Sequence, residues 1–170
     1  QSAPRRAVWL GVNLGTALLA SSVINLFQDT IEKVIALAVL MPIVASMGGI
    51  AGTQSLTILI RAMAMGQINN RNELWLIGRE SLVGFINGLL WATAIATTAS
   101  LWFGDLMLGV IIACAMFINL LTAGVTGAGL PVVLRKLRID PALAGGVLVT
   151  TVTDVMGFLA FLGLASIFYA

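Results

Sequence analysis

Long runs of apolar residues, separated by short polar stretches, dominate the chain. The runs cover residues 7–27, 34–60, 74–103, 106–134 and 142–168. Each run is at least as long as the roughly 20 residues that a helix needs to cross a bilayer. The pattern therefore predicts an all-α membrane protein with five transmembrane helices, joined by short loops such as the polar segment 28–33.

Composition excludes a soluble fold. Of the 170 residues, 59% are hydrophobic and 9% are charged, whereas a soluble domain carries about 25% charged residues. The 18 glycines are typical of helices that approach one another closely in a bilayer. A single cysteine, Cys114, rules out a disulfide within the chain. We therefore treat residues 1–170 as one transmembrane domain.

The basic residues are distributed unevenly between the two sides of the predicted bundle. Five spans put the two termini on opposite sides of the membrane. Eight of the nine basic residues fall on the N-terminal side and only Lys33 falls on the other. Because positive loops stay in the cytoplasm, we expect a multi-pass protein of the plasma membrane, the inner membrane in a bacterium, with a cytoplasmic N-terminus and an external C-terminus.

One carboxylate, Asp154, interrupts the last apolar run. In a helix it lies about 18 Å from the start of that run, close to the midplane of a hydrocarbon core about 30 Å thick. An aspartate at this depth costs roughly 2.5–3.5 kcal/mol on insertion scales. No basic residue lies at a comparable depth, so Asp154 must be protonated or must face water or a cation. Intramembrane carboxylates of this kind mark ion or proton paths.

The neighbours of Asp154 suit a hydrated ion. Thr150 lies one turn before it and can donate a hydrogen bond to its own helix backbone, and Gly157 at i+3 and Gly146 two turns back keep that face slim. The chain has no histidine, so oxygen ligands favour Mg²⁺, Ca²⁺ or Mn²⁺ over soft ions. Mg²⁺ keeps most of its waters and needs only one or two carboxylates.

Charge balance and symmetry point to a dimer. One Asp154 supplies one negative charge, and two copies around a two-fold axis would balance a divalent cation; two-fold homodimers are also the commonest oligomers. We therefore expect a second copy of the chain, the lipid bilayer and divalent cations as partners, and no nucleic acid.

Other polar residues have two interpretations each. The GGIAGTQ stretch at 48–54 either packs helices closely or lines the pore with carbonyl groups. Asn87 and Asn119 are expected to hydrogen-bond between helices. Glu80 and Asp140, near the cytoplasmic helix ends, either pair with neighbouring arginines or together form a cation-binding mouth.

Three functions other than a channel are weighed against the sequence. A proton- or sodium-coupled exporter of Mg²⁺, Mn²⁺ or Co²⁺ would use protonation of Asp154. An intramembrane protease is disfavoured, because a serine protease needs histidine and an aspartyl protease needs two carboxylates that share a proton. A scaffold subunit would not need Asp154 at all. No phosphate-binding GxxxxGKS/T loop is present, and we expect no enzymatic activity.

Three segments carry a resemblance to a known family. PIVASMGGIAGTQSLTILIRAMAMGQI at 42–68, LRKLRIDPALAGG at 134–146 and TTVTDVMGFLAF at 150–161, together with the RE pair that opens the third run, resemble the transmembrane domain of the MgtE magnesium channel family. The chain departs from that family at Ile50, where the family commonly has asparagine, and after the DPA at 140–142, where the family often has ASGP.

The resemblance implies a homodimeric five-helix Mg²⁺ channel with its pore on the dimer axis. It implies that Asp154 corresponds to the pore aspartate that recognises a largely hydrated Mg²⁺. It also implies that Asp140 and Glu80 correspond to acidic residues at the cytoplasmic mouth. Family members carry cytosolic domains that sense Mg²⁺ and close the pore, and we expect this chain to be the pore part of such a protein.

A chain without those domains should conduct without Mg²⁺-dependent closure. We expect currents through residues 1–170 to persist when cytosolic Mg²⁺ is raised, because no sensor is attached to pull the pore shut. Electrophysiological recording at increasing cytosolic Mg²⁺ measures this directly. Currents that remain inhibited would contradict the expectation.

Overall fold

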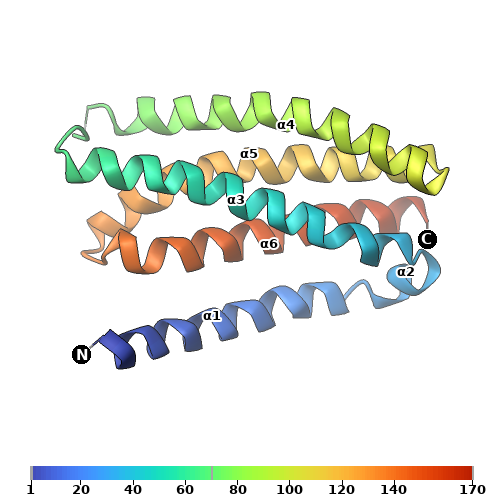
Figure 1. Cartoon of the computed structure of the whole chain (residues 1–170), viewed down its shortest axis with the longest axis horizontal. Coiled ribbons are helices and arrows are strands. Elements are labelled where there is room, and N and C mark those ends of the chain that lie inside the picture. The colour runs from blue at the N-terminus through green and yellow to red at the C-terminus, as the bar shows by residue number, and fades with distance from the viewer. Residues whose placement is uncertain (1, 70, 170) are drawn as a thin grey trace.

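The computed structural model describes residues 2–69 and 71–169, and this part of the chain is helical apart from short turns. The helices are α1 Ser2–Asn25, α2 Gln28–Lys33, α3 Ala36–Ala64, α4 Glu73–Phe103, α5 Leu106–Lys136 and α6 Pro141–Phe168. They run up and down along one long axis (Figure 1).

The prediction of five membrane-spanning helices is confirmed. Five helices of the described residues are long and apolar enough to cross a bilayer: α1, α3, α4, α5 and α6. The last four have 28–31 residues, which corresponds to about 42–47 Å of helix. They are longer than a hydrocarbon core of about 30 Å, so their ends reach beyond it.

The polar segment 28–33, predicted as a loop, forms the short helix α2 instead. The backbone N–H groups of Thr30 and Ile31 donate to the carbonyl of Phe27, which starts a helical turn. The Gln28 side chain also donates to Glu32 one turn later. Ile31 packs against the apolar core at this end of the bundle, whereas the other five residues of α2 are polar. The short helix is therefore amphipathic.

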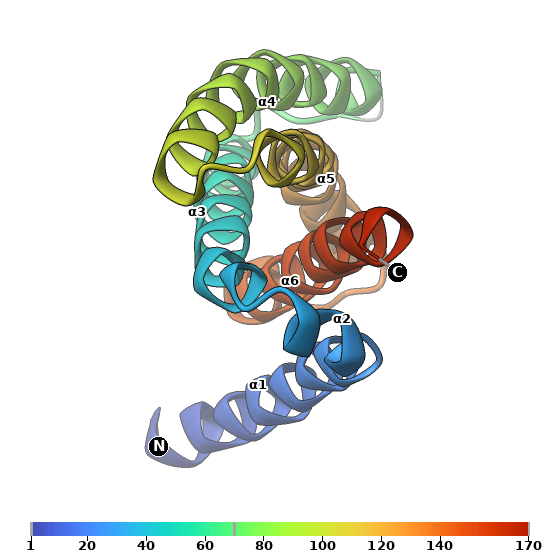
Figure 2. The same ribbon diagram turned by 90° about the vertical axis from the view of Figure 1, so that its right-hand side faces the viewer.

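Helix α5 is the centre of the molecule. Its sides contact α3, α4 and α6, and an end-on view shows these helices around it, with α1 attached at the edge of α6 (Figure 2). A large cluster of buried apolar residues, mainly from α3, α5 and α6, lies towards the end that carries the C-terminus. The outer faces of α1 and α4 expose large apolar residues, as expected for surfaces that meet lipid.

Helix α3 passes through Pro42 without ending. Pro42 has no N–H to donate, so the carbonyl four residues earlier loses a helical partner. The helix nevertheless continues from Ala36 to Ala64. In a bilayer, such interruptions are accommodated where neighbouring helices pack around them. Leu40 and Val44, two residues before and after Pro42, are fully buried.

Glycines allow helix backbones to touch. A Cβ added at Gly124 of α5 would lie 2.6 Å from the backbone oxygen of Glu80 and 3.3 Å from Cα of Gly84, both in α4. A Cβ at Gly84 would lie 2.8 Å from the backbone oxygen of Leu120. This mutual approach, the small-residue packing found in membranes, determines how closely α4 lies on α5.

A buried amide connects α5 to α3 and α6. Asn119 is 0% exposed, and its Nδ2 donates to the carbonyl oxygen of Val44 at 2.8 Å. Added Cβ atoms at Gly48 and Gly157 would lie 2.2 Å and 2.8 Å from this nitrogen. The expectation that Asn119 bonds between helices is therefore confirmed.

At the end of the bundle that carries the C-terminus, Tyr169 connects α6 to the α4–α5 turn. Its hydroxyl donates to Asp105 Oδ2, while Asp105 Oδ1 caps α5 by accepting from the N–H groups of Met107 and Leu108. Burial, followed by the hydrogen bond to Asp105 and its charge, raises the pKa of Tyr169 to about 12. The same hydrogen bond is the main reason why the pKa of Asp105 lies below its usual value.

Replacing Gly124 by alanine should destabilise the bundle. The new methyl group meets a backbone oxygen, which cannot rotate away, so α4 and α5 must separate; overpacking of this kind costs about 1–3 kcal/mol. Thermal unfolding in detergent measures the loss. Gly129→Ala is the matched control on the same helix, because nothing lies within 4 Å of a Cβ there. Equal midpoints for the two variants would contradict the assigned contact.

The single tyrosine should titrate near pH 12 instead of 10. Phenolate absorbance at 295 nm reports it, and Asp105→Asn should lower the midpoint towards 10 because the neighbouring negative charge is removed. Since the folded chain holds this proton more tightly, the contribution of Tyr169 to stability is complete below pH 10 and is lost as the pH rises towards 12. A midpoint at 10 in the native chain would refute the Tyr169–Asp105 bond.

Candidate functional site

Asp154 lies halfway along α6. It follows Pro141 by 13 residues, or about 20 Å of helix, and its side chain is half-buried. No hydrogen bond or ion pair to its carboxylate is found among residues 2–69 and 71–169. The single acid of α6 thus has no protein partner among the described residues.

Thr150 and Gly146 continue the stripe of α6 that carries Asp154. Thr150 Oγ1 donates to the carbonyl oxygens of Gly146 at 3.0 Å and Val147 at 3.1 Å, which confirms the expected bond to its own helix. A Cβ added at Gly146 would meet nothing within 4 Å. Space therefore remains beside the helix two turns before Asp154.

The structure places Gly157 differently from the sequence interpretation. It was expected on the open face with Asp154, but it is buried, and an added Cβ would lie 2.8 Å from Asn119 Nδ2 and 3.1 Å from Val44 Cγ1. A position at i+3 is rotated by about 60° from its partner, and here this rotation carries Gly157 into the contact with α3 and α5. Its small size serves helix packing.

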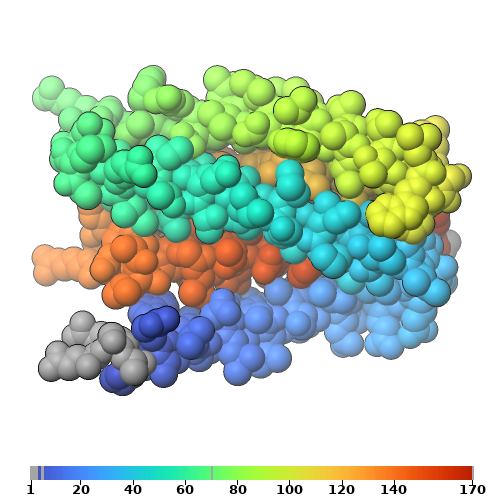
Figure 3. All heavy atoms as spheres, in the orientation of Figure 1, coloured from blue at the N-terminus to red at the C-terminus, as the bar shows by residue number. Residues whose placement is uncertain are grey.

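Helices α3 and α6 meet along a seam of small and hydroxyl residues. Added Cβ atoms at Gly49 and Gly52 would lie 3.8 Å from Thr150 Cγ2 and 2.4 Å from Val149 Cγ1. Beside these glycines, Thr53 Oγ1 donates to the carbonyl oxygens of Gly49 and Ile50. In the space-filling view, α6 appears as a band between α3 and α1 (Figure 3). The GGIAGTQ stretch therefore packs helices through its glycines and exposes Ile50 and Gln54.

The two acids expected at a cytoplasmic mouth have separate surroundings. Asp140 is exposed and caps α6, its Oδ1 accepting from Ala142 N at 2.9 Å. Glu80 is 7% exposed and accepts a hydrogen bond from Ser55 Oγ at 2.8 Å. Neither forms an ion pair within the described part of the chain. No cavity found among the described residues is lined by both acids.

Sequence reasoning missed an ionic cluster at Glu73, which is 5% exposed. Its Oε1 pairs with Arg135 and its Oε2 with Lys136 Nζ at 2.9 Å. The cluster joins the first residue of α4 to the last turn of α5. The basic pair before the α5–α6 loop was visible in the sequence, but its partner, 62 residues away, was not.

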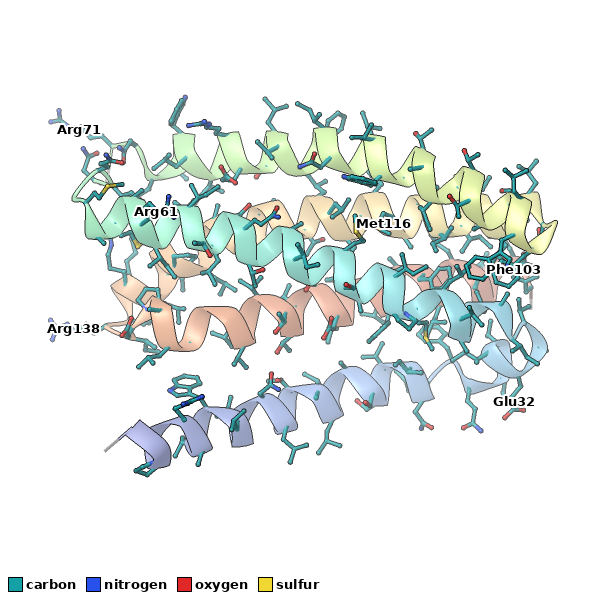
Figure 4. The ribbon with its side chains drawn as sticks, in the orientation of Figure 1. Glu32, Arg61, Arg71, Phe103, Met116 and Arg138 are labelled. Carbon is teal, nitrogen blue, oxygen red and sulfur yellow. The ribbon has the colours of Figure 1, made fainter. Side chains whose placement is uncertain are left out.

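Charged side chains collect at the two ends of the bundle. Arg71 and Arg138 project from the end where the N-terminus lies, and Glu32 projects from the opposite end (Figure 4). Between the ends, the described residues contain no group of three or more His, Cys, Asp or Glu side chains able to hold a metal ion. A cation at Asp154 would thus keep most of its water ligands, as Mg²⁺ does.

The chain is similar in sequence to known proteins. Residues 41–164 match the MgtE family model, described as a divalent cation transporter. The chain is 36% identical over 167 residues to the magnesium transporter MgtE of Bacillus subtilis (strain 168), covering 98% of the chain and 37% of that relative. It is 33% identical over 160 residues to that of Thermus thermophilus, covering 94% of the chain and 35% of the relative.

A third relative, the magnesium transporter MgtE of Enterococcus faecalis, is 31% identical over 168 residues, covering 99% of the chain and 37% of the relative. The chain thus spans a little over a third of the length of the curated relatives it matches. The family match covers well over half of the chain itself, and by this match, together with its five apolar helices, the chain belongs to the MgtE family of divalent cation transporters.

Proposed function

We propose that residues 1–170 form the ion-conducting domain of a magnesium transporter, through which Mg²⁺ passes like an ion in a channel, down its electrochemical gradient. The observation that carries this proposal is the half-buried, unpaired carboxylate of Asp154 in the middle of α6. Each divalent ion gains roughly 4.6 kcal/mol per 100 mV of membrane potential, twice the value for a single charge. The relatives named as magnesium transporters support Mg²⁺ as the ion.

The pore lies on the two-fold axis of a homodimer. A half-exposed carboxylate at mid-depth cannot face acyl chains without a cost of several kcal/mol. A second copy that covers the seam of α3 and α6 would enclose water there and bring two Asp154 carboxylates to one path. Their combined charge of −2 balances one Mg²⁺, and two-fold dimers are the commonest assemblies.

Mg²⁺ is recognised in this path with most of its waters attached. The hydroxyl proton of Thr150 is donated to backbone carbonyls, which leaves the lone pairs of its oxygen free to accept from metal-bound waters. Gly146 adds width. Asp154 supplies charge, and octahedral hydrated Mg²⁺ needs no dedicated cage of protein ligands.

The N-terminus faces the cytoplasm of a bacterial cell, and the protein lies in the inner membrane. The basic end of the bundle, with Arg71 and Arg138, then meets the negatively charged cytoplasmic leaflet. Asp140 is exposed at this same end and attracts cations weakly at the mouth, since exposed charges are screened. A proton- or sodium-coupled exporter of divalent cations is the alternative that the transport assay must exclude.

Neutralising Asp154 should abolish most Mg²⁺ transport. In liposomes that hold a fixed membrane potential, we expect Asp154→Asn to reduce Mg²⁺ influx about 10- to 100-fold, the loss typical when a metal site loses a charged partner. The influx of Mg²⁺, Ca²⁺ and Mn²⁺ is followed with a fluorescent indicator, and the three rates are compared. Asp29→Asn, an exposed acid of the short helix α2, is the matched control and should retain native flux.

Two results would overturn the proposal. Native flux in Asp154→Asn would remove the carboxylate from the ion path. Transport that follows an imposed pH or Na⁺ gradient at constant potential would favour the coupled exporter.

A further inference from the structure

A small polar cavity lies between α3, α4 and α5, away from α6 and its Asp154. Its volume is about 70 Å³. Its polar lining comes from Gln54, Ser55, Glu80 and Asn87. The backbone contact of Gly124 with Glu80 holds α4 against α5 at this level, so the cavity is part of the packed bundle.

Glu80 brings a buried carboxylate to this cavity without a counter-ion. Its Oε2 accepts from Ser55 Oγ. No hydrogen bond to its Oε1 is found among the described residues, and this atom is not fully buried, so a small ligand can reach it. The neighbouring Arg79 does not neutralise it, since that guanidinium lies over the Trp75 ring, 5.9 Å from the centroid. A carboxylate on a side chain that is only 7% exposed is costly without a counter-ion, and a cation beside it would remove that cost.

Three other side chains of the cavity lining carry hard oxygen atoms, whereas the rest of the lining is apolar. Gln54 and Asn87 have amide oxygens, and no hydrogen bond of either side chain is found in the described part of the chain. Ser55 donates its proton to Glu80, which leaves the lone pairs of its oxygen available. Oxygen sets of this kind bind hard cations.

Charge selects the occupant. A cavity of about 70 Å³ holds a few water molecules, and Mg²⁺ gives up its own water shell reluctantly. A divalent ion would also leave a net charge of +1 in a medium of low dielectric constant. One carboxylate balances one monovalent ion, which can enter with most of its water removed.

We propose that this cavity binds a single monovalent cation of the size of Na⁺. Glu80 neutralises the ion, and the oxygens of Gln54, Ser55 and Asn87 complete its coordination. The site ties α4 to α3, two helices that otherwise share few contacts. It is independent of the path proposed at Asp154.

Thermal unfolding of the whole chain in detergent tests the site. The unfolding midpoint is measured as NaCl replaces choline chloride at constant ionic strength. We expect a saturable rise with Na⁺, because a ligand that binds only the folded state stabilises it. Glu80→Gln should remove the Na⁺ dependence, and Asn87→Ala should raise the half-saturating Na⁺ concentration about tenfold or more, because it removes a ligand and keeps the charge.

The control variants separate this site from other acids. Glu32→Gln, an exposed acid at the far end of the bundle, should keep the native Na⁺ response. Asp154→Asn should keep it as well, so that a failure of the proposed Mg²⁺ path and a failure of this site are distinguishable.

Four outcomes would overturn the proposal. The first two are equal unfolding midpoints in NaCl and choline chloride, and a Na⁺ response that persists in Glu80→Gln. The third is a midpoint that depends on pH and not on Na⁺. The fourth is a Glu80-dependent shift of the midpoint that MgCl₂ produces at lower concentration than NaCl. If Glu80→Gln does not fold, an unchanged half-saturating concentration in Asn87→Ala is equally decisive against it.

Discussion

The buried amide of Asn119 is the contact on which the arrangement of α3, α5 and α6 depends. It reaches from the central helix to the carbonyl of Val44 and fits only because Gly48 and Gly157 have no side chains. One such hydrogen bond contributes about 1 kcal/mol net, but leaving its buried groups unpaired would cost more. The interaction therefore selects one rotation of α6, and this rotation leaves Asp154 half-buried beside the seam instead of inside the packed core.

The two deep acids of the chain illustrate how environment separates residues of similar chemistry. Asp154 has no hydrogen-bond or ionic partner among the described residues, and space remains beside Gly146 two turns earlier on α6, which suits an ion that passes with its water. Glu80 lies in a small cavity and holds a hydroxyl donor, which suits an ion that stays. Glu73, also buried, is fully engaged by Arg135 and Lys136 and contributes only to joining α4 to α5.

Much of the fold followed from local patterns in the sequence. The five long helices were predictable because apolar runs of this length have no stable alternative in a bilayer, where each backbone group must be satisfied within its own segment. The short helix α2 was not predicted, since five of its six residues are polar and its stability depends on the sixth, Ile31, packing onto distant helices. Thr150 bonded its own backbone as expected, because that bond needs no tertiary partner.

The sequence by itself determined the number of long apolar helices, the gathering of basic residues at one end and the place of Asp154 halfway along α6, since each depends only on position along the chain. The tertiary structure decided which way each helix is turned. It buried Gly157, separated Glu80 from Asp140, and joined Glu73 to a basic pair 62 residues away. Helix rotation depends on close contacts between segments far apart in the chain, and a pattern within one segment does not contain them.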